Sequence, residues 1–87
     1  MSVMDSMKFV EAVASTVSAG LTQHDLPVIT AAEKSGIPRT TLMRRLSSPE
    51  ISPFNLLELS QLSELLGTKV SDLIVQAEAR ASKEGEQ

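Results

Sequence analysis

Basic side chains concentrate in one short part of the sequence. Half of the eight lysines and arginines lie between residues 28 and 46, and these are Lys34, Arg39, Arg44 and Arg45. Guanidinium groups donate paired hydrogen bonds to phosphate oxygens and to the O6 and N7 atoms of guanine. Glu33 is the single acid in this segment, which therefore carries +3, whereas the whole chain carries −3 and the remainder −6. This distribution predicts a basic face on an acidic body.

Patterns typical of catalysis and metal binding are missing from the sequence. His24 precedes Asp25, but adjacent residues do not face each other on a helix, and no nucleophile motif accompanies them. With no cysteine and one histidine, the chain has no ligand set for a zinc centre. No acid–base pair and no phosphate-binding loop is visible. We therefore expect neither an enzyme nor a bound metal or cofactor.

Length and composition predict one small folded domain. The chain has 87 residues, of which 41% are hydrophobic and 22% charged, as in an average globular protein. No apolar run approaches the roughly 20 residues that span a bilayer, and the N-terminus lacks the layout of a signal peptide. We expect a domain over residues 1–82, a frayed acidic tail over residues 83–87, and no membrane partner.

Apolar residues near the N-terminus recur at steps of three and four, and these are Met7, Val10, Ala14, Val17 and Leu21. This spacing predicts a helix over residues 5–19 that stops at Gly20. Proline and glycine then delimit two short helices over residues 27–35 and 38–47, with a turn at Gly36 between them. The prolines and serines of segment 47–53 predict an extended loop.

The C-terminal half of the sequence predicts two more helices. Asn55 and Glu58 have the spacing of a capping box, which predicts a helix that begins at residue 56. Gly67 stands where a left-handed cap ends this helix after residue 66, and a fifth helix follows over residues 72–82. The row of leucines in the fourth helix predicts an intramolecular core rather than a zipper. No strand pattern is present, so the predicted fold class is all-α.

The pair of short helices has the features of a helix-turn-helix. Two helices that cross steeply need a small residue at the contact and a residue that tolerates positive φ in the turn. Ala32 and Gly36 meet these needs, and Ile37 and Leu42 supply apolar anchors for the second helix. The simpler alternative is two ordinary helices joined by a glycine turn.

The run from Ala32 to Leu42, AEKSGIPRTTL, resembles the helix-turn-helix of the phage-repressor and Cro-like family, also called lambda-repressor-like or XRE-type. Residues 55–59, 65–67 and 70–73 resemble that family's fourth and fifth helices. The resemblance implies a compact five-helix bundle, a homodimer on double-stranded operator DNA, and a transcriptional regulator of the repressor or Cro-like kind. It also implies location in the cytoplasm of a bacterium or a phage-infected cell.

On this resemblance, residues 38–47 form the recognition helix. With Leu42 buried, helical geometry turns four residues outward as candidates for base reading, namely Arg39, Thr40, Met43 and Arg44. Four further residues are expected to contact phosphates, namely Thr41, Arg45, Ser47 and Ser48. The alternative for the arginines is that they are merely solvated surface charges.

Two positions depart from the family's pattern. Val28 stands where the family often has a glutamine that contacts a phosphate, so we expect that contact to be missing or to come from elsewhere. Arg45 stands where a late apolar anchor is usual, and Leu46 follows it, so we expect the end of the recognition helix to be rotated.

Two other functions remain open from the sequence. One is an antitoxin of the same fold, which would bind a toxin through its acidic C-terminal helix and also bind its own promoter. The other is a protein-interaction module that has lost DNA binding, which the acidic balance and Val28 favour. In either case the C-terminal helix is a candidate surface for a protein partner.

Overall fold

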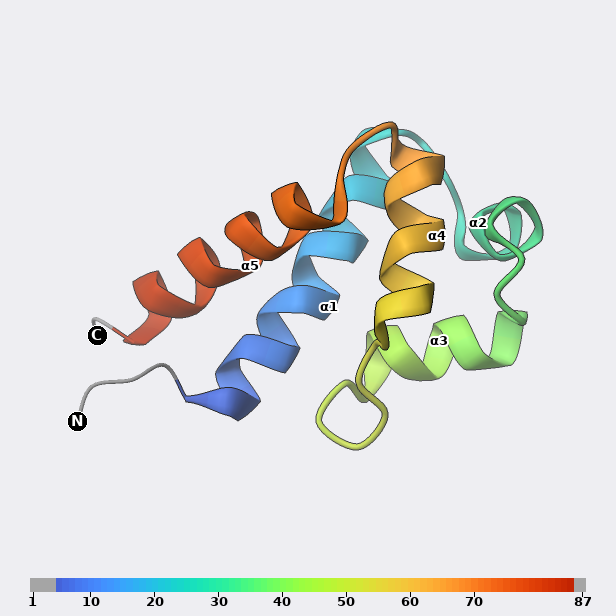
Figure 1. The fold of residues 1–87 in the computed structure, drawn as a ribbon. Helices are drawn as coiled ribbons and strands as arrows, with labels where there is room; N and C mark the ends of the chain where they lie inside the picture. Colours follow the sequence, from blue (N-terminus) through green and yellow to red (C-terminus); the bar gives the residue numbers. More distant parts are fainter. Residues whose placement is uncertain (1–4, 86–87) are drawn as a thin grey trace.

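The computed structural model describes residues 5–85, which contain five helices and the connections between them (Figure 1). The helices are α1 (Ser6–Gln23), α2 (Val28–Ser35), α3 (Arg39–Ser47), α4 (Leu56–Leu66) and α5 (Val70–Gly85). Within these residues no strand occurs, so the predicted all-α class is confirmed. The radius of gyration is 12.5 Å, close to the value of about 12 Å for a compact chain of this length.

The helices are arranged in two groups joined by α4. Helices α1 and α5 lie side by side and run in opposite directions, with the start of α1 and the end of α5 on the same side of the molecule (Figure 1). Helices α2 and α3 pack on each other at the opposite side, and α2 also packs on α4. No helix among the described residues is both long and apolar enough to cross a membrane.

The prediction that α1 ends at Gly20 was wrong, because the helix continues to Gln23. Gly20 lies against α4, and a Cβ atom placed on it would be 2.9 Å from Cδ1 of Leu66. A glycine here therefore permits the close approach of two helices instead of stopping one. The N-terminus of α1 is capped by Asp5, whose Oδ1 accepts a hydrogen bond from the Met7 backbone at 3.0 Å.

Asp25 makes the turn that ends α1. Its φ of 54° is left-handed, a conformation that aspartate tolerates better than most residues. The Leu26 N–H donates to the Leu21 carbonyl at 2.9 Å, and the Asp25 N–H donates to the Thr22 carbonyl at 3.1 Å. This pair of bonds is a Schellman motif, which satisfies the last carbonyl groups of the helix and directs the chain into α2.

Helix α4 has the predicted bounds and both predicted caps. Asn55 Oδ1 accepts from the Glu58 backbone at 2.8 Å, while a Glu58 carboxylate oxygen accepts from the Asn55 backbone at 3.1 Å. Gly67 has a φ of 69°, and the Thr68 N–H donates to the Ser63 carbonyl at 2.9 Å. The capping box and the left-handed glycine thus define α4 by local chemistry.

Helix α5 begins two residues before its predicted start and continues to Gly85, past the predicted end at residue 82. The Asp72 carboxylate accepts from the Thr68 hydroxyl at 3.0 Å and from the Lys69 backbone at 3.4 Å, so the helix is capped from within its first turn. Residues 83–85 of the expected frayed tail are therefore helical, and residues 86–87 lie outside the described part.

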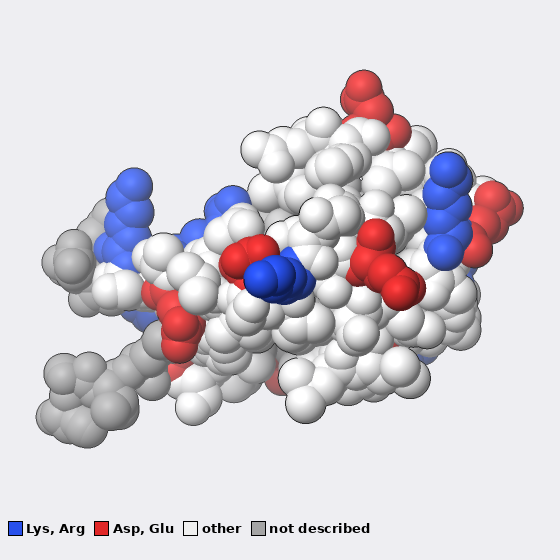
Figure 2. Space-filling model, turned by 45° about the horizontal axis from the view of Figure 1, so that its top comes forward, with Lys and Arg blue, Asp and Glu red and all other residues white. Residues whose placement is uncertain are grey.

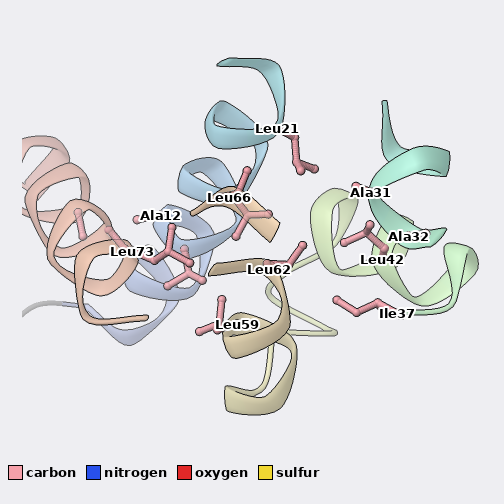
Figure 3. Packing of buried hydrophobic residues seen from close by; sticks show 14 residues of the cluster. Ala12, Leu21, Ala31, Ala32, Ile37, Leu42, Leu59, Leu62, Leu66 and Leu73 are labelled. Carbon is pink, nitrogen blue, oxygen red and sulfur yellow. The ribbon is translucent and has the colours of Figure 1, made fainter. Parts of the chain in front are cut away.

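One hydrophobic core joins the two groups of helices. Leu59, Leu62 and Leu66 of α4 point into its centre, with Leu73 and Ala12 on one side and the α2 and α3 residues on the other (Figure 3). The α4 leucines are thus buried within one chain. Leu56, in the first turn of the same helix, is 74% exposed.

Helix α5 belongs to this core through three residues spaced four apart, namely Leu73, Ala77 and Ala81. All three are buried, and α5 packs along the length of α1. Small alanine side chains on this stripe allow the two helices to lie close together.

Candidate nucleic-acid interface

The turn between α2 and α3 has the backbone that the sequence predicted. Gly36 has a φ of 85° and ψ of 4°, and its N–H donates to the Ala32 carbonyl at 3.0 Å. Ser35 Oγ accepts from the Ile37 N–H at 3.2 Å and holds the next residue of the turn. Ala31 and Ala32 are buried where α2 meets its neighbours. Small side chains and a left-handed glycine thus allow α3 to leave the turn at a steep angle.

Two apolar side chains fix α3 on the core. Ile37 precedes the helix and Leu42 lies one turn into it, and both are buried, Leu42 completely. Leu42 lies close to Ala31 and Ala32 of α2 (Figure 3). Both residues are buried as predicted, and because Leu42 faces inward, the opposite side of α3 faces solvent.

The four candidates for base reading are all exposed: Arg39, Thr40, Met43 and Arg44. Thr40 and Arg44 lie on the side of α3 opposite Leu42, Met43 lies beside them, and Arg39 is exposed as the first residue of the helix. Met43 is 47% exposed, which leaves its side chain able to contact another apolar group. This surface combines guanidinium forks, a hydroxyl group and a thioether.

The four candidates for phosphate contact differ in exposure. Ser47 is exposed at the end of α3, and Thr41 and Ser48 are half-buried. The Ser48 backbone also organises the following loop, because its carbonyl accepts from the Ile51 and Ser52 N–H groups at 3.1 and 2.8 Å.

Arg45, the fourth candidate, forms an ion pair with Glu58. Its Nε donates to Oε1 of Glu58 at 2.9 Å and its Nη2 donates to Oε2 at 3.1 Å. The side chains are 19% and 10% exposed, respectively, so the pair is largely shielded from water. Leu46, the next residue, is half-buried and packs against the core.

Glu58 joins the last turn of α3 to the first turn of α4. Its Oε1 accepts from both the Arg45 guanidinium and the Asn55 backbone. Burial raises the pKa of Glu58, but the hydrogen bonds from Arg45 and Asn55 and the attraction to the guanidinium outweigh burial and hold this pKa below its ordinary value of 4.5. The bond to Glu58 also raises the pKa of Arg45. The carboxylate is therefore ionised at neutral pH.

The sequence predicts only the capping-box role of Glu58. The signal that could have revealed its second role was an arginine at an expected apolar anchor position. A cation so placed needs a partner when it packs at the edge of a core.

The ion pair alters the charge that segment 28–46 presents to solvent. Three cations of the segment remain exposed, namely Lys34, Arg39 and Arg44, together with one exposed acid, Glu33. The charge of Arg45 is neutralised by Glu58. On the face of the molecule seen in Figure 2, acidic and basic side chains are scattered, with broad uncharged areas between them. Any electrostatic attraction of α3 for an anionic ligand therefore depends on a few exposed cations.

His24 and Asp25 are both exposed, at the C-terminal end of α1. Among the described residues, no three histidine, cysteine, aspartate or glutamate side chains are grouped closely enough to hold a metal ion.

Comparisons of this chain with protein-family models, with curated proteins and with solved structures find no significant match.

Proposed function

We propose that this chain is a sequence-specific DNA-binding transcriptional regulator of the phage-repressor or Cro-like type, with a lambda-repressor-like fold. One observation carries the proposal. Helix α3 follows a left-handed glycine turn, is held on the core by Leu42, and exposes Arg39, Thr40, Met43 and Arg44 to solvent. A helix held in this way enters the major groove with its first turns towards the base edges.

The exposed side chains suit the chemistry of the major groove. Arg39 and Arg44 each have a planar fork that matches guanine O6 and N7. Thr40 and Met43 present methyl groups that pack on the thymine methyl group. Ser47 and Thr41 then contact the phosphates on either side and set the register of α3 on the duplex.

The charge distribution predicts a shallow salt dependence. Each neutralised phosphate contributes a slope of about −0.9 to the logarithmic plot of affinity against salt. At most the three exposed cations of segment 28–46 can neutralise phosphates, so the slope for each bound chain is no steeper than about −3. Because the whole chain carries −3, non-specific binding is weak and specificity depends on base contacts.

We also propose a homodimer on DNA, because a helix of nine residues reaches only a few base pairs. Two recognition helices then bind half-sites about 34 Å apart on a near-palindromic operator. The exposed Leu56, Leu57 and Val75 are apolar side chains available to a second subunit. The same side chains favour, as a second candidate function, an antitoxin that also binds a partner protein.

Selection of bound sequences from a random pool of duplex DNA tests the function. A palindromic consensus is expected, and Arg39→Ala or Arg44→Ala should each weaken binding by about 1–3 kcal/mol at its own base pair. Arg80→Ala is the matched control, because Arg80 is an exposed arginine on α5, away from α3. A pool without enrichment, or equal affinity for selected and scrambled duplexes, would refute the proposal.

The dimer has its own measurement. Sedimentation of the protein with the selected duplex should give two chains for each operator and one chain for each half-site. One chain on a full operator would refute the dimer.

A further inference from the structure

The ion pair between Arg45 and Glu58 spans the junction between α3 and α4. Helix α3 has nine residues, and helices shorter than about 12 residues are marginal in isolation. Its direction therefore depends on tertiary contacts. Ile37 and Leu42 fix its first half, and the contacts available to its last turn are the Arg45 ion pair and the half-buried Leu46.

The pair is built as a rigid clamp. Two parallel hydrogen bonds, of 2.9 and 3.1 Å, hold both the distance and the plane of the guanidinium group. Glu58 is itself held by its own helix, because its Oε1 accepts from the Asn55 N–H and its N–H donates to Asn55 Oδ1. The carboxylate is thus an immobile anchor for the end of α3.

We propose that Arg45 is a positioning residue, which acts through Glu58 to fix the direction of α3 against α4 and does not itself contact phosphates. This inference rests on the proposed DNA-binding function. Its consequence is that Arg44, the neighbour of Arg45, stays aimed at the groove only while the clamp is closed. Binding groups must be held within about 0.5 Å of their productive positions, so a freed last turn weakens binding without loss of any DNA contact.

Glu58→Gln distinguishes a positioning role of Arg45 from a phosphate contact, because the two roles predict opposite changes in operator affinity. Glutamine keeps an oxygen that can accept from the Asn55 N–H, so the capping box survives while the ion pair is lost. A positioning role predicts operator binding about tenfold weaker, although the protein has lost a negative charge. A phosphate-contacting Arg45 would instead be released by this change, and binding would be equal or tighter.

Arg45→Lys provides a second, conservative test. Lysine keeps the positive charge that a phosphate requires but cannot donate the two parallel hydrogen bonds that Glu58 receives. A positioning role again predicts binding about tenfold weaker, with an unchanged salt slope. A phosphate role predicts near-normal binding for Arg45→Lys, and a salt slope smaller by about 1 for Arg45→Ala.

The matched control is Glu64→Gln, which makes the same change of charge at an exposed position of α4 and should leave the affinity unchanged. Circular dichroism at the assay temperature confirms that each variant is folded.

Two results would overturn the inference: tight binding by Glu58→Gln, or normal binding by Arg45→Lys. If the proposed function is wrong, the wild-type chain will select no DNA sequence, which distinguishes that failure from the results above. The inference about Arg45 would then be wrong as well.

Discussion

Substitution of Gly36 tests whether the turn before α3 requires a left-handed backbone. The φ of Gly36 is +85°, and an added Cβ atom would lie 3.7 Å from Nε2 of Gln61, an ordinary van der Waals distance. Space for a methyl group is therefore sufficient. The cost of Gly36→Ala comes from the backbone conformation alone.

The magnitude follows from two opposing effects. A left-handed backbone costs an L-residue about 1–2 kcal/mol, and replacement of glycine by alanine restricts the unfolded chain, which returns about 0.4–1 kcal/mol. Gly36→Ala should thus lower the free energy of unfolding by about 1 kcal/mol and the Tm by about 4–8 °C. Gly36→Val should lower the free energy further, by about 2–3 kcal/mol, because a β-branched residue is more strained there.

Thermal melting followed by circular dichroism measures both variants. Gly67→Ala is the matched control, because Gly67 has a φ of +69° and no atom within 4 Å of an added Cβ. It should lose a similar free energy without any change in DNA binding. If Gly36→Ala melted like the wild type while Gly67→Ala was destabilised, Gly36 would not be left-handed and the helix-turn-helix geometry would be wrong.

Three other outcomes are expected. Because the pKa of Glu58 is lower in the folded chain than its ordinary value of 4.5, the carboxylate stabilises the fold above that pH and the contribution is lost as the pH falls further. Glu58→Gln should therefore melt below the wild type at pH 7, and melts across pH should show the difference shrinking below about pH 4.5. Leu62→Ala, at a fully buried site, should cost about 2–5 kcal/mol in denaturant unfolding, whereas exposed Leu57→Ala should change stability by less than about 0.5 kcal/mol. Truncation after Gly67 removes the α5 stripe from the core, so circular dichroism should show loss of the cooperative melt, and a folded truncated chain would contradict this role.

The features predicted correctly from the sequence are those determined by neighbours in the chain. The bounds of α4 follow from Asn55, Glu58 and Gly67, because capping bonds and a left-handed glycine act within four residues. The turn at Gly36 and the burial of Leu42 follow in the same way from spacing and side-chain size. The outward direction of the base-reading candidates then follows from helical geometry.

Gly20 illustrates where such local rules fail. Taken by itself, a glycine after an apolar stripe indicates the end of a helix. In the fold, Leu66 lies against this position, and the helix passes through Gly20 to end at the left-handed Asp25. The contact with α4 outweighs the intrinsic cost of about 1 kcal/mol for a glycine within a helix.

The sequence by itself determined which segments are helical and which side of α3 faces solvent, because both depend on periodicity and on interactions within a few residues. Only the tertiary structure decided that Arg45 pairs with Glu58, which lies 13 positions further along the chain. It likewise decided that the α5 stripe packs along α1. Such contacts depend on the angles at which helices cross, and these angles are set by the joint packing of the core rather than by any one segment.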